Sequence, residues 1–202
     1  MRRRAGGDAA TYWIEKPEQI RALASPIRHE IGDHLAARGP LSAAELARVL
    51  GRRPTAIYHH LRRLVAVGLV RALPAGGERG RPALRYETVA PRMRLARAAR
   101  SPRNRGPLAR ASVTLATQVG RDYVKGFQAP HWSIEGKGRN HWFFRSVATP
   151  SPARLARINR LLDELAGVIW ESDPVAGPPI SIAWFLAPLG RGDRKSRRSP
   201  RR

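Results

Sequence analysis

The segment LSAAELARVLGRRPTAIYHHLRRLVAVGLV, residues 41–70, restricts the fold of this chain more than any other. Ser42 and Glu45 have the spacing of a capping box, which predicts the start of a short helix. Gly51 favours the end of that helix, and Pro54 suits the first turn of a second one, where its missing N–H would have no intrahelical partner. We therefore predict two short helices joined by a tight turn. The side chains that the first helix is expected to bury are Leu46, Val49 and Leu50.

The second of these helices has two different faces on a period of 3.6 residues. One face is expected to pack in a core and carries Ile57, His60, Leu61 and Leu64. The opposite face is polar and aromatic and carries Thr55, Tyr58, His59 and Arg62. Ala47 in the first helix is small enough for the two helices to cross closely. This is the pattern of a helix-turn-helix DNA reader, although an ordinary helical hairpin in another all-α domain is an alternative.

The flanking segments extend this unit. Upstream, Ser25 and Pro26 predict the cap and first turn of another helix, whose apolar residues recur at intervals of four as Ile27, Ile31 and Leu35. Downstream, residues 69–73 and 84–89 have strand composition and flank a turn-rich segment. Such a hairpin would form a wing. Its loop would offer Arg79 and Arg81 to phosphates or to a minor groove.

Residues 20–90 resemble the ArsR-type winged-helix regulators. The matching pieces are LASPIRHEI, LSAAELARVLG, TAIYHHLRRLVAVGLV and the strand-turn-strand that follows. The resemblance implies a dimeric, one-component transcription factor of bacteria or archaea. The chain departs from the family at Arg53 and Pro54, where a capping Ser or Thr followed by a polar residue is common.

The chain is strongly basic, since 38 Lys and Arg against 15 Asp and Glu give a formal net charge of +23. A chain of this charge attracts polyanions. Much of the excess lies in residues 1–4, 91–110 and 191–202, whose composition predicts disorder. These segments would raise non-specific affinity for DNA and its salt dependence without reading sequence. Solubility in an arginine-rich proteome explains them equally well.

The composition also excludes several kinds of site. The chain has no cysteine, which excludes disulfides and thiolate metal sites. Its longest apolar run, ISIAWFLAPL, is too short to span a bilayer, so we expect a cytoplasmic, nucleoid-associated protein. It contains neither a phosphate-binding glycine loop nor a nucleophile elbow. We therefore expect no enzyme, no cofactor and no metal site.

Residues 108–189 predict a second unit of α+β type. A helix is expected over residues 108–127, with Leu108, Leu115, Val119 and Tyr123 along one side. The segments NHWFFRSV, residues 140–147, and ISIAWFLAPL, residues 180–189, have strand composition and could pair in a small sheet.

Between these segments, Ser151 and Pro152 predict the start of a long helix. Its apolar residues alternate at spacings of three and four, as Leu155, Ile158, Leu162, Leu165 and Ile169. Such a seam fits a dimer interface or packing against the helix of residues 108–127. We favour the dimer, because two winged helices must be held about one DNA turn, roughly 34 Å, apart to read a two-fold site.

Two His-Trp pairs stand out in the second unit, at residues 131–132 and 141–142. A flat organic effector could stack on Trp132, His141 and Trp142. Aromatic side chains between strands more often belong to a core or a dimer interface. A metal on His131, Glu135 and His141 is not expected, because their spacing fits no closed metal site.

Together these patterns predict a mainly α fold of α+β class. The expected parts are a basic arm (1–16), a winged helix-turn-helix domain (17–90), a basic linker (91–107), a dimerisation and effector unit (108–189) and a basic tail (190–202).

The expected function is sequence-specific regulation of transcription, as a repressor, by a homodimer on a pseudo-palindromic operator. Residues expected in the major groove are Thr55, Tyr58, His59 and Arg62. Residues expected on phosphates or in the minor groove are Arg52, Arg53, Arg63, Arg79 and Arg81. Two alternatives stay open: a non-specific architectural or RNA-associated protein, and a winged helix that only binds other proteins.

Overall fold

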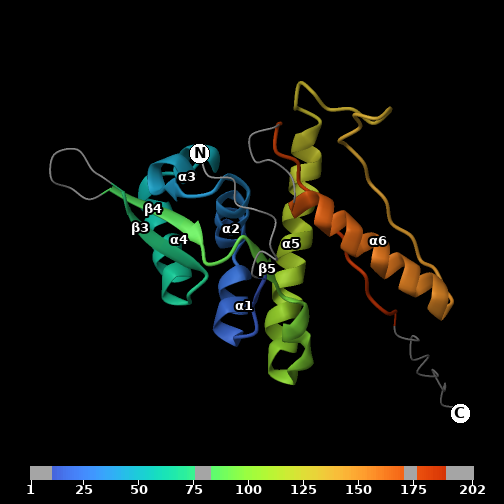
Figure 1. Cartoon of the computed structure of the whole chain (residues 1–202). Helices are drawn as coiled ribbons and strands as arrows, with labels where there is room; N and C mark the ends of the chain where they lie inside the picture. The colour runs from blue at the N-terminus through green and yellow to red at the C-terminus, as the bar shows by residue number, and fades with distance from the viewer. Residues whose placement is uncertain (1–10, 76–82, 171–176, 190–202) are drawn as a thin grey trace, which may run out of the picture.

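The structure, a computed structural model, describes residues 11–75, 83–170 and 177–189. Its first part is an α+β winged helix, as predicted (Figure 1). The helices of this part are α1 (Pro17–Leu23), α2 (Pro26–Arg38), α3 (Ala43–Val49) and α4 (Pro54–Ala66). The wing is the hairpin of β3 (Val70–Ala75) and β4 (Ala83–Thr88), which pair antiparallel from Val70 opposite Thr88 to Ala75 opposite Ala83.

Two further pairings join segments that the sequence patterns did not single out. The short strand β2 (Leu41–Ser42) pairs antiparallel with β4, so the sheet of the wing has the order β2-β4-β3. The strands β1 (Thr11–Trp13) and β5 (Arg92–Arg94) form a separate parallel pair. The first pairing ties the start of α3 to the wing, and the second joins the two ends of the winged helix to each other.

The core of the winged helix lies between its helices and the wing. Its fully buried members include Ile20, Ile31, Leu35, Leu46, Ile57, Leu61, Leu64 and Leu69. Two details of the sequence prediction are wrong. Val49 is exposed rather than buried, because the buried side of α3 is formed by Ala43, Leu46 and Ala47. Ser25 occupies the N-cap position of α2 but makes no side-chain capping hydrogen bond.

Residues 91–110, whose composition predicts disorder, are ordered. After β5 they form two 3-10 turns, η2 (Ala96–Arg100) and η3 (Pro102–Asn104), and then begin helix α5 (Arg105–Gly126). The reason is that two residues anchor the segment: Ala98 is buried, and buried Asn104 donates from Nδ2 to the carbonyls of Glu15 at 2.9 Å and Ala98 at 3.1 Å. Exposed arginines surround these anchors, at positions Arg97, Arg100, Arg103 and Arg105.

Helix α5, predicted over residues 108–127, packs along α1 and α2 (Figure 1). Its buried side chains are those of Pro107, Ala111 and Gln118, and Ala111 belongs to the core of the winged helix. Thr114 donates from Oγ1 to the carbonyl of Ala24 at 3.0 Å. The stripe expected from periodicity is only half-buried, because a different side of α5 meets α1 and α2. The residues of this stripe are Leu108, Leu115, Val119 and Tyr123.

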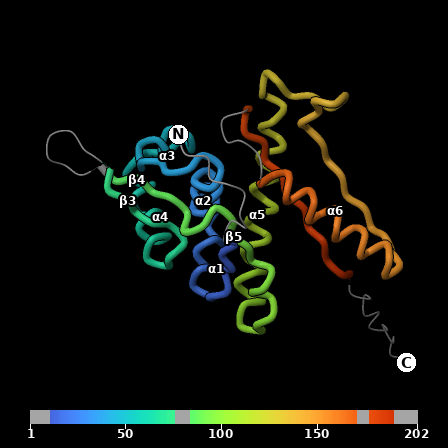
Figure 2. The backbone as a smooth tube through the Cα atoms, in the orientation of Figure 1, coloured from blue at the N-terminus to red at the C-terminus, as the bar shows by residue number. Residues whose placement is uncertain are grey.

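Helix α6 (Pro152–Trp170) forms where it was predicted, with Ser151 accepting at Oγ from the amide of Arg154. The two strands predicted beside it do not form. Residues 140–150 run extended from the region beyond α5 to the start of α6, and residues 177–189 are also without regular structure (Figure 2). A strand needs a ladder of hydrogen bonds to a second strand, and within the described chain neither segment pairs with one. In the same described ranges, no helix has the length and apolar character that crossing a membrane requires.

Candidate nucleic-acid interface

Helix α4 presents one polar face to solvent, as its sequence predicts. Ile57, Leu61 and Leu64 are fully buried against the core. The side chains on the opposite face are exposed, and they are those of Thr55, Tyr58, His59 and Arg62. Tyr58, with 48% of its surface exposed, is free to contact a ligand. The helix therefore has a face of the kind that enters a major groove.

His60 lies between these two faces and belongs to the packed side. It is half-buried, and its Nδ1 has no hydrogen-bond partner among the described residues. Burial, the nearby guanidinium of Arg28 and the ring of His59 lower the pKa of His60. The imidazole is therefore neutral at pH 7, which suits a packing role.

The first turn of α4 is basic and lacks a side-chain cap. Arg53 is the N-cap residue and makes no capping hydrogen bond, and Pro54 follows at the first helical position. Arg52, Arg53 and Arg63 are all exposed. Their guanidinium groups are therefore available to phosphates around the polar face.

Arg28 of α2 is a further basic residue at this edge that the sequence analysis did not select. It donates from Nε to the carbonyl of Ala22 at 2.6 Å. Burial and, to a smaller extent, the positive charge of Arg63 on α4 lower the pKa of Arg28. The two charges repel each other, and an anion bound near them would relieve this repulsion. No periodicity or motif marks this pair, because its members lie on different helices.

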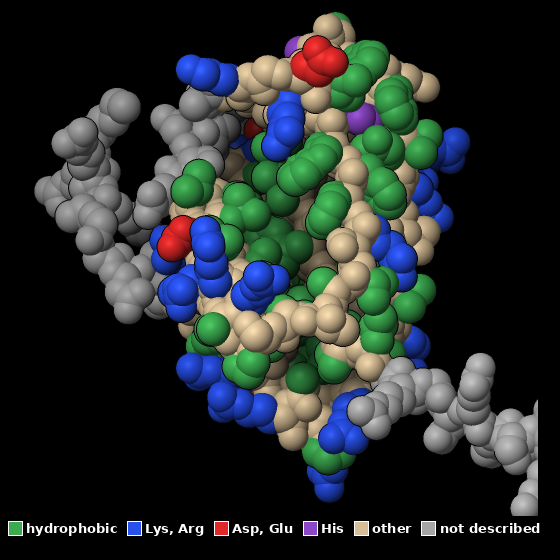
Figure 3. Space-filling view, turned by 90° about the vertical axis from the view of Figure 1, so that its right-hand side faces the viewer, with side chains coloured by type: hydrophobic (Ala, Val, Ile, Leu, Met, Phe, Trp, Pro, Cys, Tyr) green, Lys and Arg blue, Asp and Glu red, His purple; other side chains and the backbone are tan. Residues whose placement is uncertain are grey.

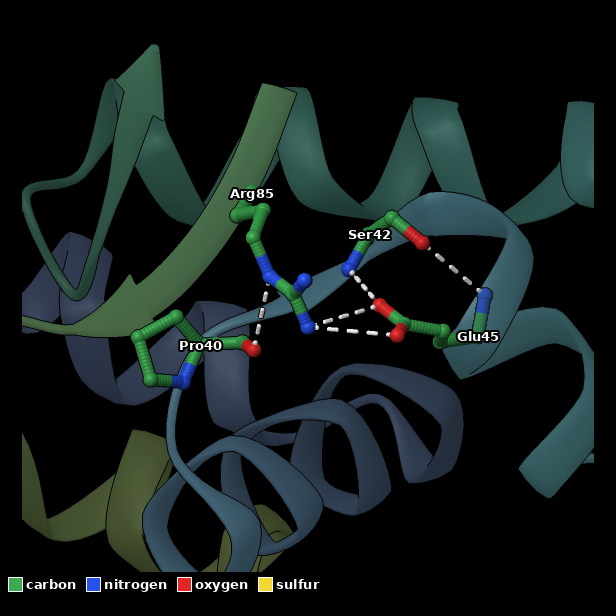
Figure 4. A network of polar contacts seen from close by, with 4 residues as sticks. All are labelled: Pro40, Ser42, Glu45 and Arg85. Carbon is green, nitrogen blue, oxygen red and sulfur yellow. Dashed lines mark hydrogen bonds and ion pairs between the residues drawn. The ribbon is translucent and has the colours of Figure 1, made fainter. Parts of the chain in front are cut away.

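The capping box of α3 forms as predicted and is tied to the wing (Figure 4). Glu45 Oε2 accepts from the amide of Ser42 at 2.7 Å, and Ser42 Oγ accepts from the amide of Glu45 at 3.2 Å. Arg85 on β4 donates from Nη2 to both carboxylate oxygens of Glu45, at 3.1 Å each, and from Nε to the carbonyl of Pro40 at 3.1 Å. The start of α3 is thus held against the wing, and Arg85 is engaged within the protein.

The hydrogen bonds from Ser42, with a smaller contribution from the charge of Arg85, lower the pKa of Glu45. A second pair links the two strands of the wing, where Arg71 Nη2 lies 2.7 Å from Glu87 Oε1. The arginines expected at the tip of the wing, Arg79 and Arg81, lie outside the described residues.

The aromatic residues selected in the second half separate into two environments. His141 is buried, and its ring lies 4.2 Å from that of Tyr123, 4.3 Å from that of Phe127 and 5.9 Å from that of Trp132 between centroids. Trp142 points elsewhere, since it is exposed and its ring contacts the guanidinium group of Arg139 and the ring of Phe144. The structure therefore brings Trp132 and His141 together and leaves Trp142 outside.

Gly126 is part of the packing around His141. A Cβ atom at this position would lie 2.9 Å from ring atoms of His141, so only glycine fits without a shift. The Nε2 atom of His141 has no hydrogen-bond partner within the described chain. Groups of three or more potential metal ligands (His, Cys, Asp or Glu) were not found in the described ranges, so His131, Glu135 and His141 do not form one there.

Comparison with protein families gives one match, over residues 23–71, to a family described as a helix-turn-helix domain. The chain carries a helix-turn-helix domain. The match spans all of α2, α3 and α4 and the beginning of β3, the elements that position the exposed face of α4. This domain supports a DNA-binding transcriptional regulator. The narrower ArsR-type assignment stays a prediction.

Two solved structures from Mycobacterium tuberculosis are similar to this chain. The crystal structure of RV1404 shares 18% identity over 77% of this chain and 84% of that chain, with a TM-score of 0.29. The MarR family protein RV2887 in complex with salicylic acid shares 22% identity over 75% of this chain and 87% of that chain, with a TM-score of 0.28. TM-scores this low do not establish a shared overall arrangement. No curated protein matches the chain.

Proposed function

We propose that the protein is a sequence-specific repressor of the ArsR type that binds a pseudo-palindromic operator as a homodimer in the cytoplasm. The observation that carries the proposal is the division of α4, which buries Ile57, Leu61 and Leu64 and exposes its polar face. A helix held in this way can lie in a major groove without rearrangement of the core. A dimer bound at a promoter would repress by excluding the polymerase.

The exposed residues of α4 have distinct proposed roles. Tyr58 and His59 would contact base edges, Thr55 would contact a base or a thymine methyl group, and Arg62 would reach a guanine or a phosphate. The arginines proposed to bind phosphates or the minor groove are Arg52, Arg53, Arg63, Arg79 and Arg81. Phosphate contacts set the register of the protein on DNA, and base contacts set the sequence preference.

In this proposal residues 17–90 bind DNA, and residues 108–189 hold the dimer and receive a signal. Trp132 is exposed beside His141, so a flat organic effector could stack there, and exposed Trp142 offers a second ring outside that cluster. Such an effector would change DNA binding only through different affinities for the competent and incompetent dimers.

The experiment that tests the proposal is selection of random duplex fragments by the purified full-length protein, followed by sequencing of the retained pool. We expect one motif with two-fold symmetry and half-sites about one helical turn apart. A pool without a motif would contradict sequence-specific binding. It would favour the non-specific architectural or RNA-associated alternative, for which the exposed arginines of residues 97–105 are the supporting observation.

Removal of residues 1–10 and 191–202 separates these two functions further. If the folded domain reads DNA, the shortened protein keeps its preference for the selected motif over random duplex. Loss of all binding would show that the basic ends carry the affinity. Absence of duplex binding by the intact protein at low salt would favour the second alternative, a winged helix that binds only other proteins.

A further inference from the structure

Large hydrophobic side chains are exposed over the C-terminal half of the described chain. Those exposed elsewhere in the described ranges are only Val49, Tyr58, Val65 and Leu84, and all others lie from Val113 onwards. Figure 3 looks onto the side of the molecule that carries α6 and shows hydrophobic side chains gathered around a hollow. An apolar surface of this extent marks a site of interaction with another molecule.

Helix α6 contributes a continuous ridge to this surface. Leu155, Ile158, Leu161 and Leu165 are spaced by three, three and four residues and are 37%, 36%, 52% and 41% exposed. This spacing places them along one side of the helix. We call these four residues the α6 ridge.

The more buried edge of the same apolar face holds the helix on the molecule. Ala166 is its buried residue, and Leu162 and Ile169 are half-buried beside it. At the end of the helix, the ring of Trp170 receives the guanidinium groups of Arg92 at 5.1 Å and Arg94 at 4.4 Å. Leu162 and Ile169 therefore form the more buried part of the apolar face of α6, and the α6 ridge forms its exposed part.

The charges of α6 are divided between its two halves. Arg154, Arg157 and Arg160 lie in the first half, and Asp163 and Glu164 lie in the second. Arg157 and Glu164 are seven residues apart, which puts them on the same flank of the α6 ridge but about 10 Å apart along the helix. In the described chain neither of them forms an ion pair.

We propose that α6 packs antiparallel against α6 of a second copy, ridge against ridge. An antiparallel pair places the basic half of each helix beside the acidic half of the other, so that Arg157 lies near the partner subunit's Glu164. Because a two-fold axis repeats every contact, this ion pair occurs twice. A parallel pair would place like charges together. The inference rests on the homodimer of the proposed function and assigns its surface.

The test is the dimer dissociation constant of charge variants of the full-length protein, measured by analytical ultracentrifugation. Arg157→Glu and Glu164→Arg each replace two attractions by two repulsions, and we expect each to weaken the dimer by about tenfold. The double variant Arg157→Glu/Glu164→Arg should regain the wild-type constant. An equimolar mixture of the two single variants should form heterodimers of similar strength.

Two further variants serve as controls. Arg160→Glu makes the same charge change about 150° around the helix from the centre of the ridge and should leave the dimer unchanged. Leu161→Lys, at an exposed position in the ridge, should give a monomer with an unchanged circular dichroism spectrum. Single charge variants that dimerise like the wild type, or a double variant that stays monomeric, would overturn the α6 arrangement.

The outcomes separate this inference from the proposed function. A dimer insensitive to the charges of α6, together with selection of a two-fold DNA motif, refutes only the assigned surface. A wild-type protein that is monomeric at every concentration, and selects a single half-site, refutes the homodimer itself.

Discussion

Arg85 on the wing donates two hydrogen bonds of 3.1 Å to the carboxylate of Glu45, the residue that closes the capping box of α3. The two residues are 40 positions apart in the sequence. Their contact joins the helix-turn-helix to the wing, so both elements of the candidate DNA interface move as one body.

Glu45→Ala should lower the free energy of unfolding by about 1–2 kcal/mol. The substitution removes the hydrogen bond from the Ser42 amide to the Glu45 carboxylate and the ion pair with Arg85. Glu45→Gln should have a smaller effect, since the amide oxygen can still accept from Ser42. Thermal unfolding of both variants measures whether Glu45→Ala loses more stability than Glu45→Gln. Glu18→Gln, which changes the same charge in the first turn of α1, is the control. Equal stability of wild type and Glu45→Ala would show that the contact contributes nothing.

The same carboxylate predicts a dependence of stability on pH. The folded pKa of Glu45 is below its ordinary value, so its contribution is complete above the unfolded pKa, near 4.3, and is lost as the pH falls through the lower folded pKa. Urea unfolding of wild type and Glu45→Gln from pH 7 to pH 3 checks this. The difference between their free energies of unfolding should narrow only below about pH 4.3. A difference that stays constant down to pH 3 would contradict the lowered pKa of Glu45.

Replacement of Tyr58 and His59 by alanine should reduce the preference for the selected motif more than it reduces general affinity. These side chains are proposed to touch base edges, where each good contact discriminates by about 1–3 kcal/mol. Competition between specific and random duplexes measures both quantities. Thr117→Ala, on exposed α5, is the control. An equal loss on both duplexes would contradict the role of the two residues in reading bases.

Replacement of Arg52 or Arg53 by glutamine should lower affinity for specific and random duplexes alike. Each lost phosphate contact should reduce the slope of log K against log salt by about 0.9. The slope is measured by fluorescence anisotropy at several salt concentrations. Arg121→Gln removes the same charge from the exposed side of α5 and should leave the slope unchanged. Identical slopes for all four proteins would place Arg52 and Arg53 away from DNA.

Gly126→Ala should destabilise the protein by about 1–3 kcal/mol, because the new Cβ would lie 2.9 Å from the His141 ring, which neighbouring aromatic rings hold in place. The fluorescence of the nearby Trp132 should change with it. Gly120→Ala on the same helix is the matched control: a Cβ there has no atom within 4 Å, and the variant should be neutral or more stable by up to about 1 kcal/mol. If Gly120→Ala destabilised the protein more than Gly126→Ala, the tight packing of Gly126 against His141 would be contradicted.

The parts of the fold that could be predicted from the sequence depend on contacts within a few residues. The capping box of Ser42 and Glu45 spans three residues, and Gly51 ends its helix with a φ of 60°, a left-handed value that glycine adopts without strain. The exposed face of α4 follows from a period of 3.6 residues, which Ile57, Leu61 and Leu64 mark. The helices, the turn and the exposed face of α4 in the candidate DNA interface could therefore be predicted from the sequence.

Contacts between distant residues decided the rest. Residues 91–110 are ordered because Asn104 bonds to the backbone of Glu15, which no composition reveals. The extended segments around α6 have the composition of strands but remain unpaired, because pairing depends on a neighbouring backbone. The sequence by itself determined the helices, the turn and the polar face of α4, since local hydrogen bonds and periodicity encode them. Only the tertiary structure decided which side of α6 is left open and which arginines are engaged within the protein, because those outcomes depend on which surfaces meet after the helices have formed.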